Sequence, residues 1–147
     1  MTVRLERINN AIQFAARNAS GYEFTVASEP EQEGVSPMEM VAMGLGGCSS
    51  IDILSILQKQ RQQVDHFDVT VEAERATDRV PAVFTSLRLN YRLEGEVEPK
   101  KVRRAIELSL EKYCSVSKML EQVAVISYRF TLNGEEYRGG RYGGPAD

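Results

Sequence analysis

The chain holds two cysteines, Cys48 and Cys114, and these are its strongest candidates for covalent chemistry. A thiolate is nucleophilic and can be oxidised reversibly, so two cysteines can work as a redox pair. Free cysteine is also one of the residue types most often buried, so both can equally be small apolar side chains of the core. The residues alone leave these two alternatives open.

The remaining side chains give weaker evidence of a catalytic or metal-binding site. His66 is the single histidine, and it lies at a predicted boundary between a loop and a strand, where we expect it to face solvent. One histidine and two widely separated cysteines make no close-spaced set of metal ligands, so we expect no metal site.

Cys48 lies in the stretch from Val35 to Gln63, which is predicted to form a helix that begins at Pro37. Ser36 suits the N-cap, Pro37 suits the first helical position, and Glu39 stands where a capping box needs an acid. Apolar residues cover nearly the whole circumference, which is typical of a core helix.

Three glycines precede Cys48 in this helix, at positions 44, 46 and 47. Each costs roughly 1 kcal/mol relative to alanine inside a helix, so we expect something to approach the backbone closely there. Close packing of two helices across a dimer axis would need the same glycines without any catalysis. The apolar helix itself favours a homodimer, which we expect to be intertwined.

Alternating patterns and turn signals predict the remaining elements. The predicted strands cover residues 3–8, 11–15, 22–26, 67–74, 83–93 and 123–132, and a polar linker covers residues 29–34. A second helix runs from residues 98–99 to 113–114, and a short helix over residues 118–122 follows an N-cap within Ser115–Ser117. The order is βββ-α-ββ-α-(short α)-β, an α+β fold with mainly antiparallel sheet. We expect one domain over residues 1–137 and a disordered glycine-rich tail over residues 138–147.

Composition narrows the possible partners. The chain has 147 residues, a net charge of −3 and a pI near 5.3, which argues against nucleic acid as a partner. No apolar run of membrane-spanning length is evident, and the first residues lack the apolar core of a signal peptide. We therefore expect no membrane partner and a cytoplasmic protein.

Two segments carry a family resemblance. The string SPMEMVAMGLGGCSSIDILSILQK, with EKYCSVSKML downstream, resembles the OsmC/Ohr family (osmotically inducible protein C and organic hydroperoxide resistance protein), and most of all its YhfA-like branch. The resemblance covers roughly residues 1–135 and implies an intertwined homodimer with its active sites at the subunit interface. We expect no cofactor. The resemblance also implies that Cys48 is the peroxidatic thiolate and Cys114 the resolving thiol, with Ser117 matching the serine of the second motif.

The activity implied by the resemblance is the reduction of organic hydroperoxides. The first cysteine attacks the O–O bond and becomes a sulfenic acid, the second condenses with it to a disulfide, and an external dithiol reduces the disulfide. An apolar wall around the thiol suits a fatty or aromatic hydroperoxide. The alternative is a non-catalytic dimer that binds a small apolar ligand or senses oxidation.

The chain departs from the hydroperoxide reductases in one motif. Their Pro-Glu pair supplies a glutamate that orients an arginine beside the thiolate, whereas Met38 stands here and Glu39 follows one residue later, about 100° round the helix. Arg17 sits in no recognisable counterpart of the arginine motif. Arg75 and Arg79, near a predicted hairpin tip, are further candidate cations, although surface solubility is their ordinary role.

Overall fold

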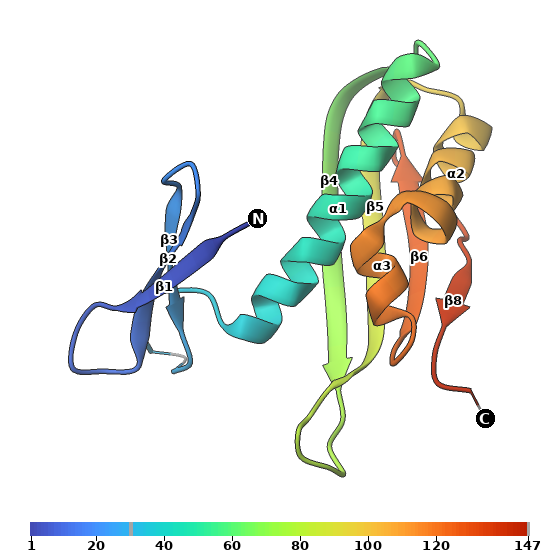
Figure 1. Ribbon diagram of the computed structural model, residues 1–147. Coiled ribbons are helices and arrows are strands. Elements are labelled where there is room, and N and C mark those ends of the chain that lie inside the picture. The colour runs from blue at the N-terminus through green and yellow to red at the C-terminus, as the bar shows by residue number, and fades with distance from the viewer. Residues whose placement is uncertain (30, 147) are drawn as a thin grey trace. The chain divides into compact units, whose positions relative to one another are not determined.

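The computed structural model describes residues 1–29 and 31–146, and the chain forms two compact units, residues 1–41 and 42–147 (Figure 1). The first unit holds a three-stranded antiparallel sheet with the order β1-β2-β3. Its strands are β1 (Val3–Arg7), β2 (Gln13–Asn18) and β3 (Glu23–Ala27). The predicted meander is therefore confirmed. A single domain over residues 1–137 stays a prediction. Pro30, within the predicted linker, and Asp147, at the end of the predicted tail, lie outside the described residues.

Helix α1 (Pro37–Lys59) begins as the sequence predicts. The Ser36 N–H donates to Glu39 Oε2 at 2.8 Å, and the Glu39 N–H donates to Ser36 Oγ at 3.3 Å. Each residue thus satisfies a backbone donor that the helix itself leaves free, which is the reciprocal geometry of a capping box.

The second unit is a sheet covered by helices. Its further elements are β4 (Gln63–Arg75), β5 (Phe84–Glu96), α2 (Pro99–Leu108), a π-helical turn (Ser109–Tyr113), α3 (Ser115–Leu120), β6 (Val125–Leu132), β7 (Glu135–Tyr137) and β8 (Arg141–Gly143). The strand order is β4-β5-β6-β7, with β8 also paired to β6. Among the pairs of strands in the described residues only β5–β6 is parallel, so the predicted α+β class with mainly antiparallel sheet is confirmed.

The core of the second unit lies between the sheet and its helices, which Figure 1 shows on one face of the sheet. The odd-numbered side chains of β5 form one buried row, as the alternation predicts: Leu87, Leu89, Tyr91 and Leu93. Leu45, Ile53 and Leu57 of α1 are also fully buried. Burying one such side chain contributes about 1.5–3 kcal/mol, so this face fixes α1 in its rotation about its own axis.

The three glycines of α1 have different surroundings. A Cβ built at Gly46 would lie 3.1 Å from Val71 Cγ2, so β4 does approach the backbone there. At Gly44 and Gly47 a Cβ would meet nothing within 4 Å in the described part of the chain. Of the three glycines, only Gly46 has another element packed against its backbone among the residues that the structure describes.

The apolar circumference of α1 is likewise only partly covered. Met43, Ile51 and Leu54 are 60%, 68% and 38% exposed. By length and composition alone α1 could cross a membrane, with a mean hydropathy of 1.7 over its best window, and this differs from the sequence-based expectation. A core helix of a soluble protein passes the same test.

The tail differs from its predicted disorder. Residues 141–143 form β8 on β6, and the Tyr128 N–H donates to the Gly140 carbonyl at 3.0 Å. A Cβ at Gly139 would collide with the Tyr128 carbonyl oxygen. The glycines that suggest disorder in the sequence therefore permit a close passage along β6.

Candidate active site

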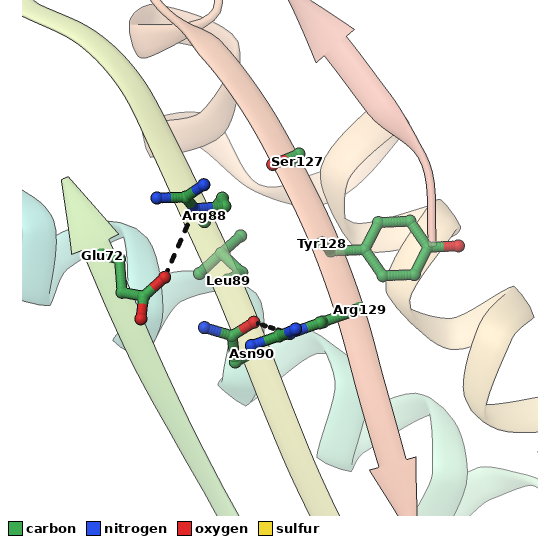
Figure 2. A pocket seen from close by; sticks show the side chains of 7 residues that line it. All are labelled: Glu72, Arg88, Leu89, Asn90, Ser127, Tyr128 and Arg129. Atoms are coloured by element: carbon green, nitrogen blue, oxygen red, sulfur yellow. Dashed lines mark hydrogen bonds and ion pairs between the residues drawn. The ribbon is translucent and has the colours of Figure 1, made fainter. Parts of the chain in front are cut away.

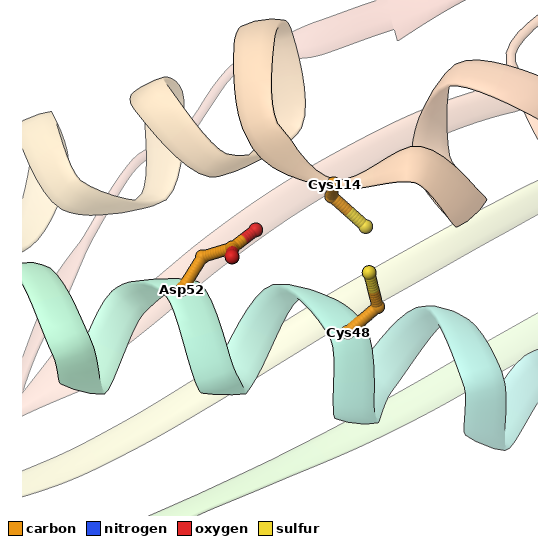
Figure 3. Close-up of side chains that lie close together, drawn as sticks. All are labelled: Cys48, Asp52 and Cys114. Carbon is orange, nitrogen blue, oxygen red and sulfur yellow. The ribbon is translucent and has the colours of Figure 1, made fainter.

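Cys48, Asp52 and Cys114 meet in the second unit. The two sulfur atoms and a carboxylate oxygen all lie within 4.8 Å of one another. In Figure 3 the sulfurs point toward each other, Cys48 from α1 and Cys114 from the segment between the π-helical turn and α3, with the Asp52 carboxylate beside them. Cys48 is half-buried and Cys114 is buried. The structure thus brings together the two cysteines that the sequence singles out.

The position of Cys48 is fixed by the turn of α1 that follows it. The hydroxyl of Ser49 donates to the Leu45 carbonyl at 2.9 Å, and the phenol of Tyr91 donates to Ser49 Oγ at 2.7 Å. Burial raises the pKa of Tyr91 far above its ordinary value, so the phenol stays a donor. This chain of bonds ties the helix to β5 directly beside the thiol.

The position of Cys114 depends on the π-helical turn. The Cys114 N–H donates to the Ser109 carbonyl at 2.8 Å, five residues back, which closes the wider turn. Such turns inside helices are frequent at functional sites. Cys114 then has extended backbone geometry and caps α3, because its sulfur accepts the Ser117 N–H at 3.3 Å.

That cap corrects the sequence-based expectation, which placed the N-cap within Ser115–Ser117 and the helix over residues 118–122. The helix is Ser115–Leu120 instead. The hydroxyl of Ser117 is engaged elsewhere, since it donates to the Leu110 carbonyl at 3.1 Å. Ser117 therefore contacts the thiol through its backbone N–H rather than through its hydroxyl.

Cys114 is held as a protonated thiol at neutral pH. Burial raises its pKa to about 12, the Ser117 N–H opposes that rise, and the neighbouring Cys48 and Asp52 add to it. The helix dipole at the N-terminus of α3 favours the thiolate form of Cys114, as the sequence suggests, but the effect of burial on the pKa is larger.

Asp52 is the residue that sequence reasoning missed. It stands four residues after Cys48, so both side chains lie on one face of α1, and that spacing was the available signal. The hydroxyl of Ser109, which is fully buried, donates to Asp52 Oδ2 at 2.9 Å. The π-helical turn thus orients the carboxylate as well as leading to Cys114.

The other predicted site residues have partners of their own. Glu39 belongs to the first unit, and the hydrogen bond from the Ser36 N–H lowers the pKa of its exposed carboxyl. Arg17 forms an ion pair with Glu23. A role for Glu39 beside the thiolate stays a prediction.

The remaining candidates lie on the surface of the second unit. The Arg75 Nε donates to the Ala82 carbonyl at 2.8 Å, so this arginine braces its own hairpin. His66 is exposed, as expected, and lies 2.8 Å from Asp68.

A groove of about 570 Å³ opens beside Asp52. Ile56, Leu108 and Tyr113 supply apolar surface to it, and Lys59 supplies a cation. A mainly apolar groove with a few polar groups is the usual form of a small-molecule site.

A second hollow, of about 270 Å³, lies on β4, β5 and β6, and Figure 2 shows its side chains. Its charged groups are already paired: Arg88 Nε lies 3.3 Å from Glu72, and Arg129 Nε donates to Asn90 Oδ1 at 2.5 Å. These pairs hold the strands together, so the candidate site is the one beside Cys48.

Comparison with known proteins finds clear relatives. Residues 30–129 match a family model described as OsmC-like protein. Protein YhfA of Escherichia coli (strain K12) is 40% identical over 122 residues, which cover 82% of this chain and 90% of that protein.

Solved structures agree. A hypothetical protein from Aquifex aeolicus VF5 is 30% identical and aligns with a TM-score of 0.77 over 90% of this chain and 96% of its own. An organic hydroperoxide resistance protein from Elizabethkingia anophelis aligns with a TM-score of 0.67 over 90% of this chain and 97% of its own. At 14% identity this is a likeness of fold alone.

Proposed function

This chain belongs to the OsmC-like protein family, and we propose that it reduces organic hydroperoxides with Cys48 as the attacking thiolate and Cys114 as the resolving thiol. The fold is the OsmC-like fold expected from the sequence. Proteins of this family are soluble, so α1 is a core helix and not a membrane span.

The observation that carries the proposal is the facing pair of sulfurs, both within 4.8 Å of the Asp52 carboxylate. A sulfenic acid is trapped as a disulfide only when a second thiol lies close, and this pair meets that requirement. The fold neighbour named for organic hydroperoxide resistance supports the choice of oxidant.

Burial and pKa indicate which cysteine attacks the hydroperoxide and which one resolves the sulfenic acid. Cys48 is the half-buried thiol, so a hydroperoxide can reach it, whereas Cys114 is buried and its pKa is raised to about 12. The thiolate is the nucleophile, so a thiol held in its protonated form is poorly suited to the first attack.

The reaction balances without a cofactor. The Cys48 thiolate attacks the terminal oxygen of the hydroperoxide, an S–O bond forms as the O–O bond breaks, and the alkoxide takes a proton from water and leaves as the alcohol. Cys114 sulfur then attacks the Cys48 sulfenic acid, an S–S bond forms, and water leaves. An external dithiol reduces the disulfide and is itself oxidised to a disulfide.

Asp52 serves the second step of this mechanism. Cys114 must lose its proton as it attacks, and a carboxylate oxygen of Asp52 lies within 4.8 Å of that sulfur, a separation that one water molecule can bridge. The Ser109 hydroxyl, at 2.9 Å, orients the carboxylate. A positioned carboxylate of this kind is a general base.

The working form in this proposal is a cytoplasmic homodimer. The exposed apolar residues of α1 (Met43, Ile51 and Leu54) and its open Gly47 would be covered by a second copy. Sedimentation at micromolar concentration tests this point, and a monomer there would contradict it.

Single turnover tests the activity. Reduced protein is mixed with cumene hydroperoxide while thiol loss is followed, and wild type is expected to lose two thiols per chain. Cys114→Ser should lose one and accumulate a sulfenic acid, and Cys48→Ser should lose none at a comparable rate. Equal consumption by Cys48→Ser, or none by wild type, contradicts the proposal.

The second candidate is a non-catalytic dimer that binds a small apolar ligand or senses oxidation. The groove lined by Ile56, Leu108 and Tyr113 favours it. A ligand bound in this groove, in a protein that leaves cumene hydroperoxide intact, would select this function.

A further inference from the structure

We propose that the reduced Cys48–Asp52–Cys114 cluster is a binding site for a thiophilic divalent cation of the zinc type. Sequence spacing gave no sign of this site, because Cys114 lies far along the chain from Cys48 and Asp52. The fold brings the three side chains together. This inference does not depend on peroxide turnover, although it concerns the same cysteines.

The distances suit the ion. The three donor atoms lie within 4.8 Å of one another. A tetrahedral zinc ion with sulfur ligands at about 2.3 Å and an oxygen ligand at about 2.0–2.2 Å needs its ligand atoms roughly 3.5–3.8 Å apart. The donor atoms therefore need to approach one another by at most about 1.3 Å to take up the spacing of zinc ligands.

The donors stand on elements that hold them in place. Cys48 and Asp52 are one helical turn apart on α1, a common arrangement for two ligands on one helix face. Cys114 comes from the cap of α3. Three protein ligands leave one tetrahedral position for water or another small donor, the pattern of open zinc sites.

Two of the three donors already accept hydrogen bonds that would orient them toward an ion. The Ser109 hydroxyl donates to Asp52 Oδ2 at 2.9 Å, and the Ser117 N–H donates to Cys114 Sγ at 3.3 Å. Partners of this kind fix the direction of metal ligands and tune their basicity. In Figure 3 the Cys114 sulfur points toward the Cys48 sulfur, and the Asp52 carboxylate lies beside this pair.

Charge favours the same class of ion. Metal binding would release the thiol protons, and the cation would then compensate the charges of two thiolates and a carboxylate in this partly buried space. Thiolate ligands select soft or borderline ions such as zinc over magnesium or calcium. Bound zinc would occupy Cys48 sulfur, so metal binding and oxidation would exclude each other.

Titration of the reduced full chain with zinc against a chromophoric chelator tests the site, and cobalt serves as a spectroscopic substitute. We expect one ion per chain and a thiolate-to-cobalt absorption band. Cys48→Ser and Cys114→Ser should each weaken binding at least about 100-fold, and Asp52→Asn about tenfold or more. Asp68→Asn, which neutralises an exposed carboxylate elsewhere, should leave the affinity unchanged.

Oxidation supplies a test that needs no variant. Wild type oxidised with diamide should lose zinc binding, and a dithiol should restore it. Zinc binding that survives oxidation or both cysteine substitutions, or no binding at micromolar zinc, overturns the proposal. Peroxide turnover is measured separately with a chelator present, so its failure leaves the metal result standing, and the reverse is also true.

Discussion

The phenol of Tyr91, on β5, donates a 2.7 Å hydrogen bond to the hydroxyl of Ser49, the residue next to Cys48 on α1. Both side chains are buried, and Ser49 passes the interaction on to the Leu45 carbonyl. A single bond therefore joins the sheet to the helical turn that carries the reactive thiol.

Tyr91→Phe should lower the free energy of unfolding by about 1 kcal/mol, the usual net value of one buried hydrogen bond. Ser49 can still donate to Leu45, so its hydroxyl is not left wholly unpaired. Urea unfolding measures the change. Tyr22→Phe, at a side chain that is 79% exposed, is the matched control and should have no effect.

Asp52→Asn should slow disulfide formation without slowing the first attack. An amide cannot take the Cys114 proton, and a positioned general base contributes about 10²-fold or more to such a step. Trapping with dimedone should show a longer-lived sulfenic acid at Cys48. The hydroxyl deletion Ser109→Ala should give a smaller delay, because the carboxylate remains but loses its 2.9 Å donor.

Ser55→Ala serves as the control, since Ser55 lies one turn along α1 on the rim of the groove. An Asp52→Asn variant that closes its disulfide at the wild-type rate would remove Asp52 from the mechanism. Slower loss of the first thiol would instead place Asp52 in the peroxide step.

Tyr128→Phe should change the pH dependence of stability in the alkaline range only. Burial and then Glu107, whose carboxylate accepts the phenol at 3.1 Å, raise the pKa of Tyr128 from 10.0 to about 12, while Arg103 partly opposes the rise. The folded state thus holds this proton more tightly than the unfolded chain does. Its contribution is complete below pH 10 and is lost as pH rises toward about 12.

Urea unfolding between pH 8 and 12 measures that contribution. Wild type should lose more stability than Tyr128→Phe between pH 10 and 12, and the difference between them should be constant below pH 9. Parallel curves throughout would show that the phenol ionises as freely in the folded protein as in the unfolded chain.

Alanine substitutions of the α1 glycines should separate the cost of crowding by a Cβ from the gain in helix propensity. Gly46→Ala puts a Cβ 3.1 Å from Val71 Cγ2, and the cost of this crowding opposes the gain in helix propensity of about 1 kcal/mol, so this variant should be less stable than Gly44→Ala. Gly44→Ala meets nothing within 4 Å in the described chain and should add about 0.5–1 kcal/mol through helix propensity. Thermal unfolding at several concentrations measures both, and a loss at Gly44 that grows on dilution would indicate contact with a second copy.

The sequence predicted the parts of this protein that depend on local pattern. Ser36 and Glu39 cap α1 as their spacing requires, and Leu87 and Leu93 lie in the buried row that alternation defines. Local rules suffice there because the partner is a few residues away or the period is fixed.

The sequence did not predict the parts that depend on distant pairing. Asp52 looks like one polar residue on an apolar helix until Ser109 is seen to donate to it. Gly139 looks like a residue of a disordered tail until its passage against Tyr128 is seen. In both cases the meaning of a residue comes from a neighbour that its own segment does not contain.

The π-helical turn makes the thiol pair sensitive to chain length. Between Ser109 and Tyr113 the backbone accommodates one residue more than an α-helical turn would. If the same five residues were wound as an ordinary α-helix, everything after them would be rotated by about 100°. Cys114 would keep its identity and its neighbours in sequence, yet its sulfur would no longer face Cys48. The site is therefore specified by a residue count as much as by the two cysteines themselves.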